Sequence, residues 1–516
     1  MGTYEVKVYT AGGIFPQTKD YIYMRLVGEE GESDSTWISE KCEIKTDKSL
    51  GKLQQIVIHK ETSFHLLPDD WLPAKIEVKT HKNETYIFPL YTWITDDGKH
   101  YFREGQAFIP SEDPFDPSSR QEEISKRQDA YRWKISEKGI PDHIKAKDMD
   151  DLPKDAQFTF SKAADFTIEA IKGQVWDKVK SFFFGDNKWS GFDEIGDMMD
   201  YSKYKLLDYV RNNWKDDDFF GYQFLNGLNP MVIRRCETLP DNFSVTDDMI
   251  SQYSKGPSSL DQELKLKQDP GADNPIFLPT DHHYEWLLAK TFVRSAEFNL
   301  HQLNFHLLRT HLLAEVFAVS TRRNLPMVHP LYKLLIPHTR YTLAINVLAR
   351  QMLISEHGVF TEIAASGGEG MFQLLRRSLS KIKYRSLCIP DDIEDRGMDK
   401  IPNFYYRDDG MKLWNSLHRF FSGILKHYYK TDKDVKADAE LQDWIGDIFR
   451  HGFLSNKKSG IPNKFTTVAD LVKFVTMVIF TGSVQHSAVN SGQSNSSGVV
   501  TKMPRAGLDQ PMGPVR

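Results

Sequence analysis

Three histidines stand five residues apart, His301, His306 and His311, in the stretch HQLNFHLLRTHLLAE. Positions five apart on an α-helix point about 140° away from one another, so a regular helix would send these side chains in different directions. They would share one side only if the helix widened locally to a π-turn, an irregularity often found at functional sites. Because neutral imidazole is the most common protein ligand for transition metals, the spacing favours a metal site. A polar core helix whose histidines bond neighbouring side chains explains the spacing equally well.

The composition indicates an ordinary globular protein of two or three domains. Among the 516 residues 40% are hydrophobic, and 66 basic residues against 71 acidic ones give a net charge of −5, so we expect no nucleic-acid partner. The three cysteines are too few and too scattered for a disulfide framework or a thiolate zinc site. The N-terminal MGTYEVKVYT lacks the apolar segment of a secretory signal, and no apolar run approaches the ~20 residues of a membrane span. We therefore expect a cytoplasmic chain.

The pattern of the chain changes near residue 115. Before it, short alternating runs rich in β-branched and aromatic residues predict an antiparallel sandwich, with strands at 4–9, 21–27, 53–59, 74–79 and 85–93. After it, the period becomes helical, with long segments at 120–133, 284–318, 331–353, 411–429 and 468–480. Residues 494–516 are rich in Ser, Gly and Pro and predict a disordered tail.

A second chemical signal precedes that tail, in VIFTGSVQHSAVNSGQ. His486 and Asn490 lie four residues apart and would share one face of a helix. Brought to a site with two imidazoles, they would complete a mixed nitrogen and oxygen set that suits iron or manganese better than zinc. Taken alone, this stretch is explained more simply by a histidine that packs near a helix end.

Together these stretches resemble the animal lipoxygenases. The resemblance runs from about residue 2 to residue 493, with long, multiply interrupted motifs. These are His301–Gln302 through His306 and His311 to Glu315, VHPLYKLLIPH (328–338), FFGYQFLNGLNP (219–230), NPIFLPTD (274–281), WLLAKTFVRS (286–295), YTLAINVLAR (341–350), YYRDDG (405–410) and QHSAVNSGQ (485–493). The wording of KIPNFYYRDDG and AVNSGQ is most similar to the epidermis-type group, some of whose members isomerise fatty-acid hydroperoxides.

The resemblance implies a role for individual residues. His306, His311 and His486 match the imidazole ligands of a non-haem iron, and Asn490 matches a weaker ligand. Gln302 matches a catalytic residue behind the ligands that links the iron helix to the substrate cavity.

Other matching positions hold no metal. His301 matches a position that is not a ligand, and His329 and His338 match positions that would buttress the iron helix. Leu307 and residues 364–368 match parts of the substrate channel, although EIAASGGEGM departs from the glycine run usual there.

The implied fold is a mainly α catalytic domain of the lipoxygenase type at 116–493, behind an all-β PLAT or C2-like sandwich at 1–115. The implied reaction is dioxygenation of polyunsaturated fatty acids of the arachidonate and linoleate class by O2, giving hydroperoxides. A hydroperoxide isomerase is the alternative. The sandwich would associate peripherally with a membrane through aromatics such as Phe15, Phe64 and Trp71, if these are exposed rather than packed inside. The acidic run 29–34 is a weaker candidate for Ca2+.

Two departures from the family pattern affect the expected activity. The family's motifs end after Gln493, whereas relatives continue to a C-terminal carboxylate that binds the iron, and a block is missing near residues 265–271. We therefore expect a truncated helical bundle with weak iron binding and little dioxygenase activity. In that case a catalytically dead isoform would still bind membranes or a partner lipoxygenase.

Overall fold

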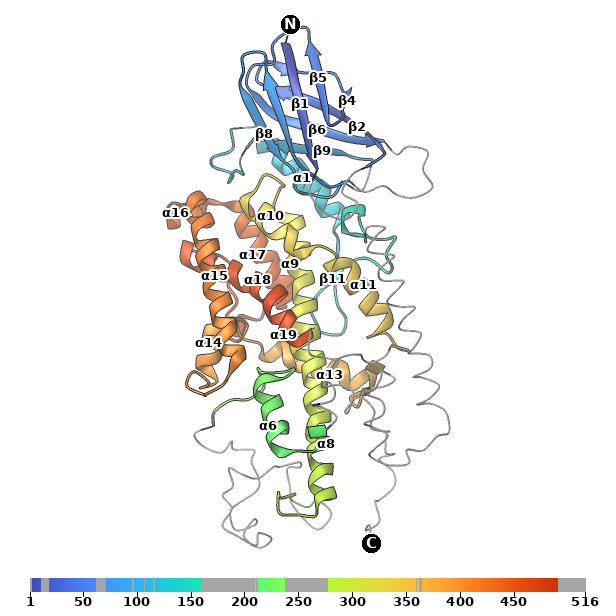
Figure 1. The fold of residues 1–516 in the computed structure, drawn as a ribbon, viewed down its shortest axis with the longest axis vertical. Helices are drawn as coiled ribbons and strands as arrows, with labels where there is room; N and C mark the ends of the chain where they lie inside the picture. The colour runs from blue at the N-terminus through green and yellow to red at the C-terminus, as the bar shows by residue number, and fades with distance from the viewer. Residues whose placement is uncertain are drawn as a thin grey trace.

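The computed structural model describes residues 2–10, 18–61, 71–94, 97–105, 107–114, 117–158, 209, 212–236, 277–358, 360–361 and 364–490. Within these ranges a β-sandwich at the N-terminus leads into a body built almost entirely of helices, which extends away from one end of the sandwich (Figure 1). The predicted fold class is therefore confirmed.

The sandwich consists of two antiparallel sheets. One sheet has the order β5 (Lys41–Thr46), β1 (Gly2–Thr10), β7 (Pro73–Thr80), β8 (Thr85–Pro89). The other has the order β3 (Gly31–Glu32), β2 (Tyr21–Gly28), β6 (Leu53–Glu61), β9 (Lys99–Arg103), with β4 (Thr36–Trp37) also on β2. Alternate residues point inward, as Tyr4 and Val6 do on β1 and Met24 and Leu26 on β2. The five predicted strands are confirmed, although the one predicted at 85–93 ends at Pro89. The short strands β3 and β4 were missed, and so were β5 and β9, because charged residues obscure their alternation.

The aromatic residues of the sandwich differ from the expectation at one position. Trp71 is only 4% exposed and packs in the core between the sheets, where its backbone pairs with Ile94. Its expected role as an exposed membrane-facing side chain is therefore wrong. Phe15 and Phe64 lie outside the described residues. The exposed aromatics include Trp37 (53%) and Tyr21 (52%), on β4 and β2.

The helical body follows a short linker. Its elements are α1 (Pro117–Ala130), β10 (Trp133–Lys134), β11 (His143–Ile144), η1 (Lys154–Ala156), α6 (Asp217–Asn226), α8 (His283–Leu300), η4 (His301–Leu312), α9 (Leu313–Asn324), α10 (Pro330–Leu335), η5 (Ile336–Thr339), α11 (Thr342–Met352), α13 (Gly367–Lys381), η6 (Arg385–Leu387), α14 (Ile389–Asp395), α15 (Tyr405–Tyr428), α16 (Asp432–Ala437), α17 (Ala439–Gly452), η7 (Lys457–Ser459), α18 (Val468–Phe480), η8 (Thr481–Gln485) and α19 (His486–Asn490).

One long helix forms the axis of this body. It runs without interruption through α8, η4 and α9, which lie end to end in Figure 1. Nearly every residue of α9 is buried, because α1, α11 and α17 pack around it. The helix predicted at 284–318 is thus confirmed, and the structure extends it at both ends.

The helix predicted at 331–353 is divided in the structure. It breaks into α10, the 3-10 turn η5 and α11. Pro337 provides no N–H to continue the helix, and Tyr341 takes a left-handed conformation with φ 63°. The apolar period continues across the break, which is why the sequence suggested one helix.

A second core helix crosses the body through α18, η8 and α19. Residues 468–490 reach the length and hydropathy of a membrane span, which the sequence reasoning had not anticipated. However, 67% of the most apolar stretch is buried inside the structure, as in a core helix of a globular domain. Its side chains belong to the same apolar cluster as Leu303, Leu307 and Leu308 of η4.

Candidate metal centre

Three imidazoles converge at the point where the two core helices meet. The Nε2 atom of His306 lies 3.1 Å from that of His311 and 3.3 Å from that of His486, and the latter two are 3.1 Å apart. Within the part of the chain that the structure describes, they form one of two groups of three or more potential metal ligands. The structure therefore brings together residues separated by 180 positions in the chain.

The backbone explains why two histidines five apart can converge. Residues His301–Leu312 form a π-helix, in which each turn holds more residues than in an α-helix. The predicted widening of the helix is confirmed. A second π-turn, η8, ends directly before His486. The sequence did not predict this second π-turn, because only one candidate ligand, His486, follows it and a single histidine gives no spacing to interpret.

The three imidazoles are neutral. Burial lowers the pKa of His306 to about 2, helped by the proximity of His311 and His486. Burial and the neighbouring His486 lower the pKa of His311 to about 4. Burial also lowers the pKa of His486. Each ring therefore retains a nitrogen lone pair at ordinary pH, which is the form that binds a metal.

Amide oxygens behind two of the rings determine which nitrogen is free. The Nδ1 atom of His306 lies 3.3 Å from Oε1 of Gln302, and that of His311 lies 3.2 Å from Oδ1 of Asn346. Since an amide oxygen only accepts hydrogen bonds, each ring proton belongs on Nδ1. This leaves the Nε2 lone pairs directed at the centre of the triad.

The geometry fits a transition-metal ion. An ion held about 2.1 Å from each nitrogen, with bond angles near 90–110°, requires nitrogens about 3.0–3.4 Å apart. The observed separations of 3.1–3.3 Å fall in this range. Three ligands also leave further coordination positions open for oxygen donors.

Comparisons with known proteins identify the family. A lipoxygenase family model matches residues 263–510, and a PLAT/LH2 domain model matches residues 4–106. Human polyunsaturated fatty acid lipoxygenase ALOX15B is 35% identical over 98% of this chain and 84% of its own length. This chain belongs to the lipoxygenase family.

Two further relatives agree. Human hydroperoxide isomerase ALOXE3 is 32% identical over 96% of this lipoxygenase and 84% of its own length. The anaerobic crystal structure of a lipoxygenase variant in complex with arachidonate has a TM-score of 0.86 at 29% identity, over 97% of this chain and 84% of that one. The family model's match continues past Gln493, the last residue that the motifs alone had assigned to the family.

The other histidines of the lipoxygenase motifs lie outside the triad. His301 is fully buried, and its Nε2 lies 2.9 Å from the carbonyl oxygen of Val489 on α19. His329 caps α10 and binds Asp438, so it supports the helices around the site. His338 is exposed on the 3-10 turn η5, and its expected role as a buttress stays a prediction.

The second potential ligand group is already satisfied by protein partners. It contains His329, Asp438 and Glu440. Both oxygens of Glu440 are bound by the guanidinium of Arg120, at 2.8 and 2.5 Å. The group therefore forms part of the ion-pair framework between helices.

Three expectations about ligands and substrate stay predictions. Asn490 is the exposed last residue of α19, and no contact tests its role as a weaker ligand. Leu307 is buried in the helical core. The acidic run 29–34 forms the β2–β3 hairpin, where Glu32 pairs with Arg25 at 2.9 Å; within the described residues, it gathers no group of three acidic or histidine ligands.

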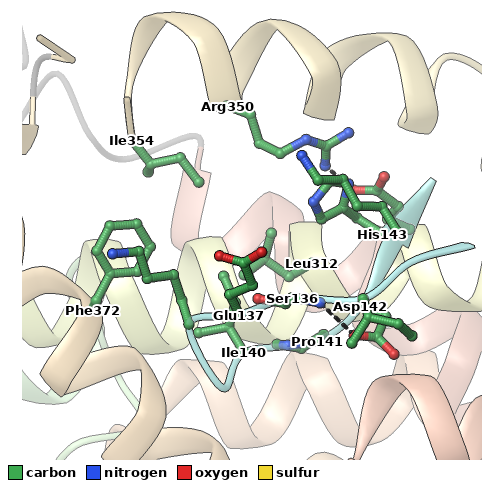
Figure 2. Close-up of a pocket in the computed structure, with 14 residues that line it drawn as sticks. Ser136, Glu137, Ile140, Pro141, Asp142, His143, Leu312, Arg350, Ile354 and Phe372 are labelled. Atoms are coloured by element: carbon green, nitrogen blue, oxygen red, sulfur yellow. Dashed lines mark hydrogen bonds and ion pairs between the residues drawn. The ribbon is translucent and has the colours of Figure 1, made fainter. Parts of the chain in front are cut away.

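A cavity of about 280 Å3 opens beside the metal helix (Figure 2). Apolar side chains including Ile140, Leu312 and Phe372 line it together with cationic ones. Figure 2 shows Arg350 on α11 reaching across toward His143. Neither Leu307 nor residues 364–368 are among the lining residues, so this cavity is distinct from the channel that the motifs suggested.

Proposed function

We propose that this lipoxygenase holds a non-haem iron through His306, His311 and His486 and oxygenates polyunsaturated fatty acids to hydroperoxides. The observation that carries the proposal is the convergence of three neutral imidazoles at one partly buried point. The names of two relatives support the substrate class, since one is a polyunsaturated fatty acid lipoxygenase and the other was crystallised with arachidonate.

Iron held by the three imidazoles would supply one-electron redox chemistry: it would accept an electron as the doubly allylic CH2 group loses a proton, and it would return that electron once O2 has added, so that with a proton the product is the hydroperoxide. The amide oxygens of Gln302 and Asn346 support the Nδ1–H tautomer of His306 and His311, respectively. Leu303, Leu307 and Leu308 of η4 belong to the main apolar core, and Phe305 of η4 and Val489 of α19 belong to a smaller apolar cluster, so apolar side chains border the elements that carry the triad. An apolar surrounding of this kind suits an acyl chain better than a polar substrate.

A hydroperoxide isomerase is the second candidate. A human relative of this name shares 32% identity over almost the whole chain. The same ligand set would serve both reactions, so the choice depends on which substrate is consumed.

Metal content tests the proposal first. The purified chain, the His306→Ala variant and a His338→Ala control are loaded anaerobically with ferrous ion, desalted and analysed by plasma mass spectrometry. His338 is the matched control because it is an exposed histidine outside the group of three imidazoles. The sequence predicted weak iron binding, and that prediction is untested; the convergence of the three imidazoles instead leads us to expect about one iron per chain in the wild type and the control and none in His306→Ala. Absence of iron from all three would overturn the proposal.

Activity then separates the candidates. Conjugated-diene absorbance with arachidonate or linoleate indicates the dioxygenase, and loss of added hydroperoxide without new diene indicates the isomerase. An iron-loaded chain that does neither would be a catalytically inactive member of the family.

We also propose that the PLAT domain associates peripherally with lipid surfaces. Trp37 pairs with Tyr23, and Tyr21 lies two positions along the same strand, so the three rings share the outer face of the second sheet. Aromatic rings of this kind insert at membrane interfaces because one part is apolar and another polar.

A further inference from the structure

Asn346 on α11 connects His311 to the ion pair between Glu315 and Arg350. Its Oδ1 lies 3.2 Å from Nδ1 of His311. Its Nδ2 donates to the carbonyl oxygen of His311 at 2.8 Å and to Oε2 of Glu315 at 2.8 Å. The side chain of Asn346 is almost fully buried, so its amide is bonded to these protein groups rather than to solvent.

These contacts determine the orientation of the amide. Both partners on the Nδ2 side, a backbone carbonyl and a carboxylate, can only accept hydrogen bonds. A flipped amide would place its oxygen against these two acceptors, which is repulsive. The oxygen must therefore point at His311, and the ring must present a proton to it on Nδ1.

Glu315 is itself held in place. Its Oε2 accepts from Arg350 at 2.6 Å, and its Oε1 accepts from the backbone N–H of Ile144 on β11 at 3.2 Å. The carboxylate of Glu315 is fully buried. A buried carboxylate with these donors stays fixed as an acceptor for Asn346.

We propose that Asn346 is a positioning residue that keeps His311 in its Nδ1–H tautomer, with Glu315 and Arg350 fixing the amide. The Nε2 lone pair of His311 then faces the other two imidazoles without rearrangement. The metal-affinity part of this inference rests on the proposed function, whereas the tautomer does not.

The tautomer is measured in the metal-free chain by NMR of 15N-labelled histidine. The His311 signals are assigned by their loss in His311→Gln. The wild type is expected to show Nδ1–H for His311. The Asn346→Leu variant, which removes the acceptor at similar volume, is expected to shift toward Nε2–H.

Asn324→Leu is the matched control. Asn324 is also a buried helical asparagine, and its Nδ2 donates to Ser320 at 2.9 Å and Asp447 at 3.1 Å, away from the triad. This variant suffers a comparable loss of buried hydrogen bonds, so we expect it to retain the wild-type tautomer.

Affinity for ferrous ion, measured by anaerobic equilibrium dialysis, gives the second readout. Removal of such a supporting partner commonly weakens metal binding about 10–100-fold. We expect this loss in Asn346→Leu and not in Asn324→Leu.

The outcomes separate this inference from the proposed function. A wild type with Nε2–H on His311 overturns the inference, whether or not any variant folds. An Asn346→Leu chain that matches Asn324→Leu in tautomer and iron affinity also overturns it. A wild type with the Nδ1–H tautomer but no affinity for iron supports the positioning role and contradicts the proposed function alone.

Discussion

His329 and Asp438 each cap the first turn of a different helix, and they bind each other between the two. The Nδ1 atom of His329 accepts from the N–H of Leu331 at 3.1 Å, and Asp438 accepts from the N–H of Leu441 at 2.9 Å. The remaining atoms, Nε2 and Oδ2, lie 3.1 Å apart, and Tyr429 donates its hydroxyl to the same Oδ2 at 2.7 Å. α10 and α17 are therefore fixed to each other at their ends.

Replacing Asp438 with Asn should destabilise the chain at neutral pH. The change removes a charged acceptor from a fully buried site and leaves His329 and Tyr429 poorly paired. We expect a loss of about 2–4 kcal/mol in the free energy of unfolding, measured by urea titration at pH 7. A loss within experimental error would show that the cluster contributes no net stability.

The difference in unfolding free energy between the wild type and Asp438→Asn should depend on pH. Burial by itself would raise the pKa of Asp438, but His329, the N–H of Leu441 and Tyr429 together hold the pKa below 3.8. A depressed carboxyl pKa stabilises the fold above the unfolded value and loses that effect as the pH falls toward the folded value. The difference between wild type and Asp438→Asn should therefore be constant from pH 7 to 5 and narrow below about 3.8.

Two glycines of α15 should respond to alanine in opposite ways. A Cβ at Gly410 would overlap Cδ1 of Ile389 on α14 and lie 3.7 Å from Cζ of Phe480. Overpacking of this kind costs about 1–3 kcal/mol, partly offset by the better helix propensity of alanine. At Gly423 a Cβ meets nothing within 4 Å, so alanine should stabilise by about 0.5–1 kcal/mol. Thermal unfolding midpoints that move in the same direction would contradict the packing argument.

Replacing Arg120, near the start of α1, should lower the free energy of unfolding. Arg120 binds Glu440 of α17 through two nitrogens and Asp113 at 2.7 Å, and Asp113 in turn binds Arg103 of β9 at 2.5 Å. Because all of these groups are largely buried, Arg120→Leu removes the cation bound to Glu440 and one of the two cations at Asp113, and it should cost about 3–5 kcal/mol.

Lys126→Ala on the same helix is the control. Its exposed pair with Glu122 should contribute nothing measurable, since water screens such pairs. Equal unfolding midpoints for the two variants in denaturant would show that the linker network is not a structural determinant.

Lipid association should depend on the aromatic face of the PLAT domain. Trp37→Ala and Tyr21→Ala should each weaken binding to phosphatidylcholine vesicles, and the double variant should weaken it several-fold in a sedimentation assay. Ile87→Ala is the control, because Ile87 is 40% exposed but lies on the other sheet. An equal effect from Ile87→Ala would indicate nonspecific adsorption.

The sequence predicted the metal helix more accurately than its surroundings. The spacing of His301, His306 and His311 required a widened helix, and this is a local property that the structure confirms. The sequence predicted Trp71 as exposed, whereas it is buried. Its burial depends on a pairing with Ile94, 23 residues further along the chain, which the local sequence does not show.

Asn346 could not be assigned from its own neighbourhood. Asn346 lies within the motif YTLAINVLAR, which by itself gives the residue no role, and its partner His311 is 35 residues away. A signal was nevertheless present, since a single amide interrupts an apolar face of α11 whose neighbours Leu343 and Val347 are buried. Polar residues in such positions have a partner from another element.

The π-helix also determines which kinds of sequence change this site can accept. A substitution in η4 changes one side chain, but an insertion or deletion of one residue between His306 and His311 changes the angle between the two rings by roughly a quarter of a turn. The wide turn therefore makes chain length, rather than residue identity, the quantity that related sequences must preserve in this segment. The convergence of the two rings therefore depends on the number of residues between these two histidines.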